Sequence, residues 1–279
     1  MKQNLVILGA GGNMGTRLSE IMRHEPDYEL VCVESDPRRH EGILKRGLTV
    51  TDADVALPRA DIVIMAIADH VLPMVAQGVV PKLKPGAMVV CLDPAAPHAG
   101  KLPRRPDISY FVTHPAHPPV FNDETDWEAR RDFFGKGKAK QAIVNALMQG
   151  PESDYARGEA VARALFKPIL RSHRVTVEQM AILEPVLSET VAATCLVVIR
   201  EAMDEAIRRG VPPQAARDFL MGHLNIELAI VFNEIDWNFS LGAQQAIASA
   251  KKRLFRDDWK GVFDPEELKR SVDEITTPK

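Results

Sequence analysis

The chain has 279 residues, of which 46% are hydrophobic and 26% charged, and its formal net charge is −3. The length predicts two domains or one large one, and the composition excludes a disordered or collagen-like chain. Without a basic excess we expect no nucleic-acid partner, and three cysteines far apart in apolar sequence are expected to be core residues rather than a disulfide framework.

The first half of the chain alternates short apolar runs with helical patterns. Such runs are typical of strands buried on both faces, and the alternation predicts an α/β fold with a doubly wound parallel sheet, the Rossmann arrangement. Ligands of such sheets bind at the carboxyl ends of the strands. The predicted strands are 5–8, 29–33, 61–67, 87–92 and 108–112, and a weaker run at 142–147 adds a strand or begins a helix.

A glycine-rich run follows the first predicted strand and precedes a helical pattern. The apolar stretch before it is too short for a secretory signal, so we expect a cytoplasmic protein. Its spacing departs from G-x-G-x-x-G and gives a G-x-x-G-x-x-G variant on Gly9, Gly12 and Gly15. Such glycines let the backbone approach a pyrophosphate at a helix N-terminus. We therefore assign cofactor binding to Gly9, Gly11, Gly12, Asn13, Met14 and Gly15.

Acidic residues at two further strand ends extend the predicted nucleotide site. Glu34 ends the second strand, where a carboxylate accepts hydrogen bonds from ribose hydroxyls and repels a 2′-phosphate, which favours NAD. Arg38 and Arg39 follow it and leave NADP open as an alternative. Ala68 and Asp69 follow the strand at 61–67 and are expected to contact the cofactor, although Asp69 also suits the N-cap of the next helix.

Two histidines follow the strand at 108–112, at the edge where substrates bind. His114 and His117 flank Pro115 and Ala116, and prolines there would hold the side chains in place. A histidine in this position can be a general base or a metal ligand, or it can be a structural loop residue. The irregular, proline-rich and charged segment 114–140 is expected to be a loop that packs over another part of the molecule.

The second half is predicted to be helical. Thr176 and Gln179 form a capping box, so we expect a helix from there to about residue 209, kinked at Pro185. Residues 186–199 are apolar nearly all round the helix, and their longest uncharged run is too short for a membrane span. Such a helix is buried by its own domain or by a partner, which predicts a homodimer without a membrane partner. Further helices are expected at 213–232 and 240–255, before a charged tail. The change from strands to helices predicts two domains, a dinucleotide-binding domain (1–175) and a helical substrate and dimerisation domain (176–279).

Two side chains of the helical half are candidates for chemistry. Glu184 precedes Pro185 in an apolar context, where a carboxylate is neutralised, hydrogen bonded or bound to a metal. His223 and Glu227 are four residues apart and lie on one helix face. That face either closes a substrate cleft or is simply an interior face of the helical domain. No lysine occurs from Pro168 to Ala250.

The glycine run, the strand-rich first half and the helical second half together resemble the 6-phosphogluconate dehydrogenase-like superfamily. Its hydroxyacid dehydrogenase branch uses a lysine on the interdomain helix, which the helix predicted here lacks. The segments THPAHPPVFN and GHLNIELAIVF are instead similar to the D-apionate oxidoisomerase branch.

That resemblance implies a reaction and a site. An alcohol of a sugar acid is oxidised by NAD and the product rearranges, which converts D-apionate into 3-oxo-isoapionate. The rearrangement resembles that of ketol-acid reductoisomerase, in which a divalent cation polarises the migrating system. The resemblance therefore implies that His114 and Glu184 ligate a divalent metal, Zn or Mg, and are catalytic together with His223.

Two other functions stay open from the sequence. The first is simple hydride transfer, without rearrangement, by a hydroxyacid or prephenate-like dehydrogenase with histidine as the base. The second is a redox sensor that binds NAD(H) and signals through its helical domain.

Overall fold

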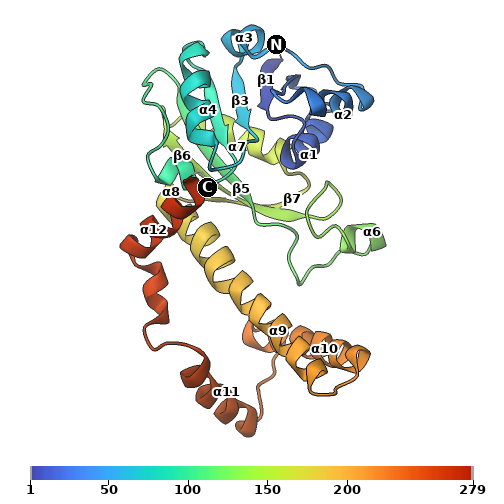
Figure 1. Cartoon of the computed structure of the whole chain (residues 1–279). Helices are drawn as coiled ribbons and strands as arrows, with labels where there is room; N and C mark the ends of the chain where they lie inside the picture. Colours follow the sequence, from blue (N-terminus) through green and yellow to red (C-terminus); the bar gives the residue numbers. More distant parts are fainter. Residues whose placement is uncertain (1, 278–279) are drawn as a thin grey trace. The chain divides into compact units, whose positions relative to one another are not determined.

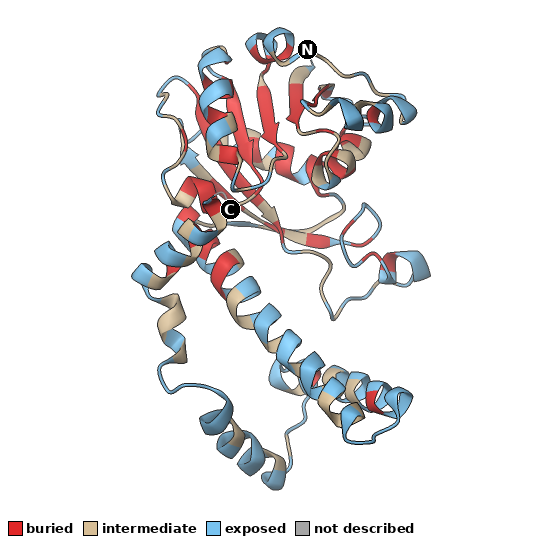
Figure 2. Ribbon diagram, in the orientation of Figure 1, coloured by how far each residue is buried: buried red, intermediate tan, exposed pale blue. Residues whose placement is uncertain are grey.

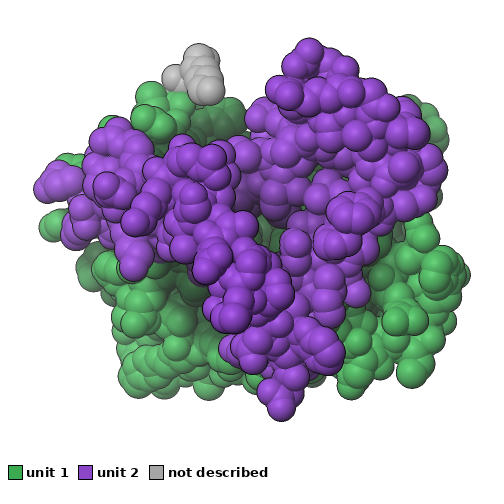
Figure 3. Space-filling model, turned by 90° about the horizontal axis from the view of Figure 1, so that it is seen from below, with its two compact units in different colours: residues 1–185, 269–279 green, residues 186–268 purple. Residues whose placement is uncertain are grey.

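The computed structural model describes residues 2–277 and divides the chain into two compact units. Unit 1 comprises residues 1–185 and 269–279, and unit 2 comprises residues 186–268 (Figure 3). The functional division expected between residues 175 and 176 stays a prediction, because these units are defined by packing alone.

Unit 1 is built on one seven-stranded sheet in the order β2-β1-β3-β4-β5-β6-β7 (Figure 1). The strands are β1 (Gln3–Leu8), β2 (Tyr28–Val33), β3 (Ile62–Met65), β4 (Met88–Cys91), β5 (Ser109–Pro115), β6 (Gln141–Gln149) and β7 (Ile169–Arg174). The α-helices of this part of the chain are α1 (Asn13–Met22), α2 (His40–Lys45), α3 (Ala53–Ala56), α4 (Leu72–Val79), α5 (Ala95–His98), α6 (Trp127–Arg130), α7 (Asp154–Leu165) and α8 (Val177–Ala181). Short 3₁₀ segments lie at Pro37–Arg39, Leu57–Arg59 and Val80–Lys82.

The sheet is mostly parallel, as the sequence predicts, but its last two strands are reversed. Strands β1 to β5 run parallel to their neighbours, β6 pairs antiparallel with β5, and β7 pairs parallel with β6. A single bridge between Cys32 and Val50 adds the remnant of a strand beside β2. In chain order, β2 is added on one side of β1 and β3 on the other side, so the topological switch point lies between β1 and β3.

Both faces of the sheet are covered, because alternate residues of each strand pack into one of two separate hydrophobic clusters. One cluster joins Leu5, Ile7 and Phe111 to α1 and α7. The other joins Val6 and Val89 to α4 and α8. Figure 2 shows the central strands as the main buried part of this unit. This two-sided burial explains why the strands read as continuous apolar runs.

A long helix links the units. It begins at α8, where Thr176 and Gln179 form the predicted capping box. It continues through a π-helical stretch (Ile182–Ala193) that contains Pro185, and through α9 (Thr194–Arg208). The proline has no N–H for the i→i−4 ladder, and the helix widens there rather than ending. The whole helix, Val177–Arg208, is long and apolar enough to cross a membrane by length and composition alone, and only 11% of its most apolar window is buried in this single chain.

Unit 2 is helical and nearly without a core of its own. Its further helices are α10 (Pro213–Val231), α11 (Leu241–Leu254), a 3₁₀ turn (Trp259–Phe263) and the start of α12 (Pro265–Thr276). Among its residues, all of which the structure describes, the buried hydrophobic side chains are Val186, Ala216, Ala229 and Leu268. Most of the unit is therefore exposed in one chain (Figure 2).

Candidate functional site

The glycine run lies in the turn from β1 to α1, at the carboxyl edge of the sheet. Gly9 has φ +77°, and a Cβ there would lie 2.5 Å from the carbonyl oxygen of Ala66. A Cβ on Gly15 would collide with the Gly9 carbonyl and lie 2.7 Å from Cα of Ala10. The turn is therefore closed against the loop after β3 and against the helix that follows, which only glycines allow.

The N-terminus of α1 has the form of an anion site. Its N-cap is Gly12, which has no side chain to cap the first turn, and the Thr16 N–H is the donor to the Gly12 carbonyl oxygen. Among the described residues no side chain caps the N–H groups of Asn13, Met14 and Gly15, which point toward this end of the helix. Free N–H groups and the positive end of the helix dipole suit a pyrophosphate.

Glu34 is buried beside this turn and organises it. One carboxylate oxygen accepts the Gly11 N–H at 2.9 Å and the other accepts the Asp36 N–H at 2.9 Å. Its carbonyl oxygen is 2.9 Å from Nε2 of His40. The carboxylate therefore stands at the end of β2 with one hydrogen bond on each oxygen and a further lone pair on each for a ribose hydroxyl.

The two arginines after β2 differ in their surroundings. Arg38 pairs with the Asp36 carboxylate through its Nε and Nη2, and these hydrogen bonds lower the pKa of Asp36 to about 2. Arg39 lies against the glycine run, since a Cβ on Gly11 would be 2.6 Å from Cβ of Arg39. Arg39 is thus a cation beside the glycine turn, as is Arg46, whose Nη2 donates to the Ala10 carbonyl oxygen at 3.3 Å.

The loop after β3 also reaches this edge. The carbonyl oxygen of Ala68 accepts the N–H groups of Val71 and Leu72, each at 2.9 Å. Helix α4 begins at Leu72 with Val71 as its N-cap, so Asp69 is not the N-cap that the sequence allowed. Ala68 is exposed and Asp69 half-buried beside the glycine turn, where both were expected to contact a cofactor.

His114 lies near the end of β5 with a fixed ring orientation. Its Nδ1 is 2.8 Å from the Leu92 carbonyl oxygen, at the end of the neighbouring strand β4. Because a carbonyl only accepts, Nδ1 carries a proton, and Nε2 lies on the other side of the ring.

Glu184 faces that nitrogen from the π-helical stretch. Its Oε2 lies 3.5 Å from Nε2 of His114, and both groups belong to unit 1. A lone pair and a carboxylate at this distance repel each other unless a proton or a cation lies between them. The structure thus brings the two predicted residues together as a pair suited to hold a proton or a cation.

Asp93 is a residue of this site that the sequence reasoning missed. Its Oδ1 accepts the Ala95 N–H at 2.8 Å, and its Oδ2 lies 4.0 Å from Nδ1 of His114. It follows the predicted strand 87–92 directly, which is the position that marked Glu34. The signal was therefore present in the sequence.

His117 lies next to His114 at the start of the predicted loop. We call residues 116–140 the strap; it contains the short helix α6. Nδ1 of His117 is 3.2 Å from the Phe134 carbonyl oxygen, and the two histidine rings meet edge to face at 6.4 Å. Both histidines therefore donate from Nδ1 to a carbonyl oxygen, and in His114 the other ring nitrogen, Nε2, faces Glu184.

His223 belongs to α10 in unit 2. Its ring stacks on Phe219 at 4.0 Å, and its Nδ1 is 2.9 Å from the Phe219 carbonyl oxygen. It is exposed in the single chain, and its place in a substrate cleft or in an interior face stays a prediction. Within residues 2–277 no group of three or more His, Cys, Asp or Glu side chains is placed to hold a metal ion.

The chain is similar to known proteins over nearly its whole length. Residues 122–276 match the family model described as phosphogluconate dehydrogenase (decarboxylating), C-terminal domain. A D-apionate oxidoisomerase from Cupriavidus necator is 53% identical over 99% of this chain and 100% of its own length. Another from Rhizobium rhizogenes is 52% identical over 98% of this chain and 99% of its own length.

A solved structure from Cupriavidus necator has the same fold over the whole chain. It is described as a semialdehyde dehydrogenase NAD-binding protein in complex with calcium and NAD. It superposes with a TM-score of 0.96 at 53% identity and covers 99% of this chain and 100% of that chain.

Proposed function

Because this chain belongs to the D-apionate oxidoisomerase family, we propose that it is an NAD-dependent enzyme that oxidises a branched sugar acid and rearranges its carbon skeleton. The substrate that its relatives' name indicates is D-apionate, and the product we propose is 3-oxo-isoapionate. The observation that carries the chemistry is the facing pair of His114 Nε2 and Glu184 Oε2, 3.5 Å apart at the carboxyl edge of the sheet. We place the reaction in the cytoplasm.

The dinucleotide fits the first turn of the fold. The uncapped start of α1 would hold the pyrophosphate, and Glu34 would accept hydrogen bonds from the adenosine ribose. The carboxylate of Glu34 disfavours a 2′-phosphate, so we propose NAD rather than NADP. Arg39, beside Gly11, is the residue that would accommodate NADP if this assignment is wrong. When bound, the nicotinamide accepts a hydride from the substrate.

The first step leaves a proton that this chain must take. As the alcohol carbon loses its hydride, the hydroxyl loses its proton to Nε2 of His114. The Leu92 carbonyl holds the opposite nitrogen protonated, and the Glu184 carboxylate stabilises the imidazolium that forms. Oxidation thus delivers one hydride to the cofactor and one proton to the pair.

The rearrangement is balanced without a further oxidant. The tertiary hydroxyl at the branch carbon loses its proton and becomes a carbonyl. One carbon substituent migrates with its bonding electron pair to the neighbouring carbonyl carbon, and the oxygen of that carbonyl takes up a proton. The step therefore needs a proton acceptor and a proton donor close together, which is what a protonated His114 beside Glu184 supplies.

We also propose a second form of the same pair, in which a divalent cation, Zn or Mg, is bound between the two side chains. In that form Nε2 of His114 is a metal ligand, and the second carboxylate oxygen of Glu184 takes the substrate proton in its place. His114 Nε2 and Glu184 Oε2 are two ligands of types that divalent cations accept, and their mutual repulsion favours a cation between them. A cation there would act as a Lewis acid on the substrate oxygens. Two protein ligands leave positions open for substrate, but they fit a structural metal site poorly.

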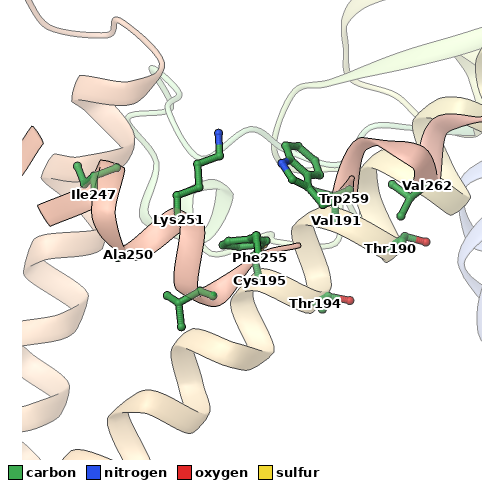
Figure 4. A pocket seen from close by; sticks show the side chains of 11 residues that line it. Thr190, Val191, Thr194, Cys195, Ile247, Ala250, Lys251, Phe255, Trp259 and Val262 are labelled. Atoms are coloured by element: carbon green, nitrogen blue, oxygen red, sulfur yellow. The ribbon is translucent and has the colours of Figure 1, made fainter. Parts of the chain in front are cut away.

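We propose that the active enzyme is a homodimer formed through unit 2. Large apolar side chains in this unit remain exposed in one chain, among them Leu196, Val197 and Val198. An apolar groove of about 540 Å³ between α9 and α11, lined by Cys195, Phe255 and Trp259 among others, also lies open (Figure 4). Residues 176–279 would then complete the site and the dimer, with His223 contributing from α10.

Product analysis tests the proposed function. The purified protein is incubated with NAD and D-apionate, with linear aldonates as controls, and NADH and the carbon skeleton of the product are followed by absorbance and NMR. We expect NADH formation with a rearranged skeleton, loss of turnover in His114→Ala with NADH binding retained, and loss of turnover with a chelator that Mg or Zn restores. An unrearranged keto acid would support the simple dehydrogenase, and NADH binding without turnover of any sugar acid would support the sensor.

A further inference from the structure

A buried arginine outside the site packs against the strap that carries His117. Arg17 lies in the second turn of α1 and is 8% exposed. Its Nη2 donates to the Gly135 carbonyl oxygen in the strap. Its guanidinium lies 4.8 Å from the ring centre of Phe134 and 5.7 Å from that of Phe166. Burial lowers the pKa of Arg17 while the Asp132 carboxylate opposes that effect.

Phe134 also contacts His117. The Phe134 carbonyl oxygen accepts the Nδ1 proton of His117, and the two rings lie 5.2 Å apart. His117 has φ +60°, a left-handed conformation that costs a non-glycine residue about 1–2 kcal/mol. A side chain persists in such a conformation only where its neighbours hold it.

The contacts therefore form a chain from the helix of the glycine turn to the substrate side. Arg17 holds Phe134 and Gly135, Phe134 holds His117, and the His117 ring stands at the edge of His114. None of these contacts involves the glycine run. The series of contacts can therefore be broken without disrupting the dinucleotide site.

We propose that Arg17 is a positioning residue for the reaction, which acts through Phe134 to place His117 with its Nε2 lone pair toward the substrate. The inference rests on the proposed function for its chemistry. The rearrangement moves protons between two substrate oxygens, and His117 is a second imidazole beside His114 that can take part in that exchange. The contacts of Arg17 are to the strap and to Phe166, so we assign it an effect through Phe134 and not a catalytic role.

The test combines histidine NMR with kinetics on the full-length protein. In ¹⁵N-histidine-labelled wild type we expect both His114 and His117 to carry the proton on Nδ1, with each signal assigned by its loss in the corresponding glutamine variant. In Arg17→Met we expect His117 to lose that preference while His114, held by Leu92, keeps it. With D-apionate we expect kcat/KM to fall at least about tenfold, while the Kd of NADH stays within about twofold of wild type.

A double-mutant cycle separates positioning from general damage. Arg17→Met should add nothing in a His117→Gln background, because the residue through which it acts is already missing. Phe134→Leu, at a partly exposed ring, should repeat the effect without loss of fold, and Arg163→Met, an exposed arginine on α7, should behave as wild type. An unchanged His117 tautomer in Arg17→Met, or additive losses in the cycle, would overturn the inference. If wild type does not turn over D-apionate, the proposed function fails, and the NMR result still decides the role of Arg17.

Discussion

At the residue scale, the glycines of the run between β1 and α1 have different structural roles. Gly9 and Gly15 close the turn on each other and on the loop after β3, while Gly11 makes room for Glu34 and Arg39. The variant spacing therefore keeps the close approach of helix and strand at Gly15, three residues after the N-cap Gly12. This explains why Met14 can occupy the position at which the standard fingerprint has its third glycine.

Substitution of Gly15 by alanine tests this division of tasks. The added Cβ has no room against Gly9 and Ala10, so we expect the free energy of unfolding to fall by about 1–3 kcal/mol and NADH binding to weaken. Urea unfolding and a fluorescence titration with NADH measure the two effects. Gly78→Ala is the matched control, because that helical position in α4 has open space around it. It should raise stability by about 0.5–1 kcal/mol and leave NADH affinity unchanged; equal NADH affinity in both variants would contradict the assignment.

At the element scale, one carboxylate binds three backbone N–H groups of the strap. Asp132 accepts the backbone N–H groups of Lys136, Lys138 and Ala139 at 2.7–3.2 Å. Burial would raise the pKa of Asp132, but these hydrogen bonds outweigh it and hold the pKa below its usual range. The folded state therefore binds fewer protons than the unfolded state near the usual pKa of a carboxyl group, and the strap is stabilised above that range.

The sign of this effect gives a pH-dependent prediction. At pH 6, Asp132→Asn should lower the free energy of unfolding by about 1–3 kcal/mol, because an amide cannot accept all of these donors equally well. The difference from wild type should shrink as the pH falls below about 4 through the folded-state pKa, where the wild-type carboxyl becomes protonated. Urea unfolding at several pH values measures it, with the exposed Asp123→Asn in the same segment as control. A loss of unfolding free energy in Asp132→Asn that does not change with pH would contradict the assignment of the effect to the carboxylate.

The elements also show where sequence reasoning succeeds and stops. The first five strands were predicted within a few residues, since burial on both faces leaves a continuous apolar run. Strand β7, with the sequence ILRSHR, was missed because it is an edge strand whose polar residues mask the pattern. Helix α12 was taken for a charged tail because its apolar residues Leu268 and Val272 are few, although both are buried.

The site was predictable to a similar degree. Residues that directly follow a buried strand, such as Glu34 and His114, could be found because strand ends meet at one edge. The role we infer for Arg17 could not, since it depends on a contact between residues 118 positions apart. A side chain in the second turn of a helix carries no local sign of such a partner.

At the scale of the whole molecule, we expect a second chain to cover the exposed apolar surface of unit 2. Leu196, Val197 and Val198 are consecutive and each at least half exposed. Consecutive helical residues point about 100° apart, so the three together cover more than half of the helix circumference. A single flat partner surface could not bury all three, and we therefore expect helices of a second copy to pack around α9.

Val197→Arg tests this assembly. Wild type should have twice the 30.9 kDa chain mass by light scattering at micromolar concentration, whereas the variant should be monomeric or lose helix content, because a guanidinium cannot be buried there without a partner. Val55→Arg introduces the same charge at a similarly exposed valine of unit 1 and should remain dimeric. Loss of the dimer should also remove turnover while NADH binding persists, because the dinucleotide turn lies entirely in unit 1 and the completion of the site is assigned to unit 2. A wild-type protein that is monomeric and active would exclude the dimer as a requirement for the reaction.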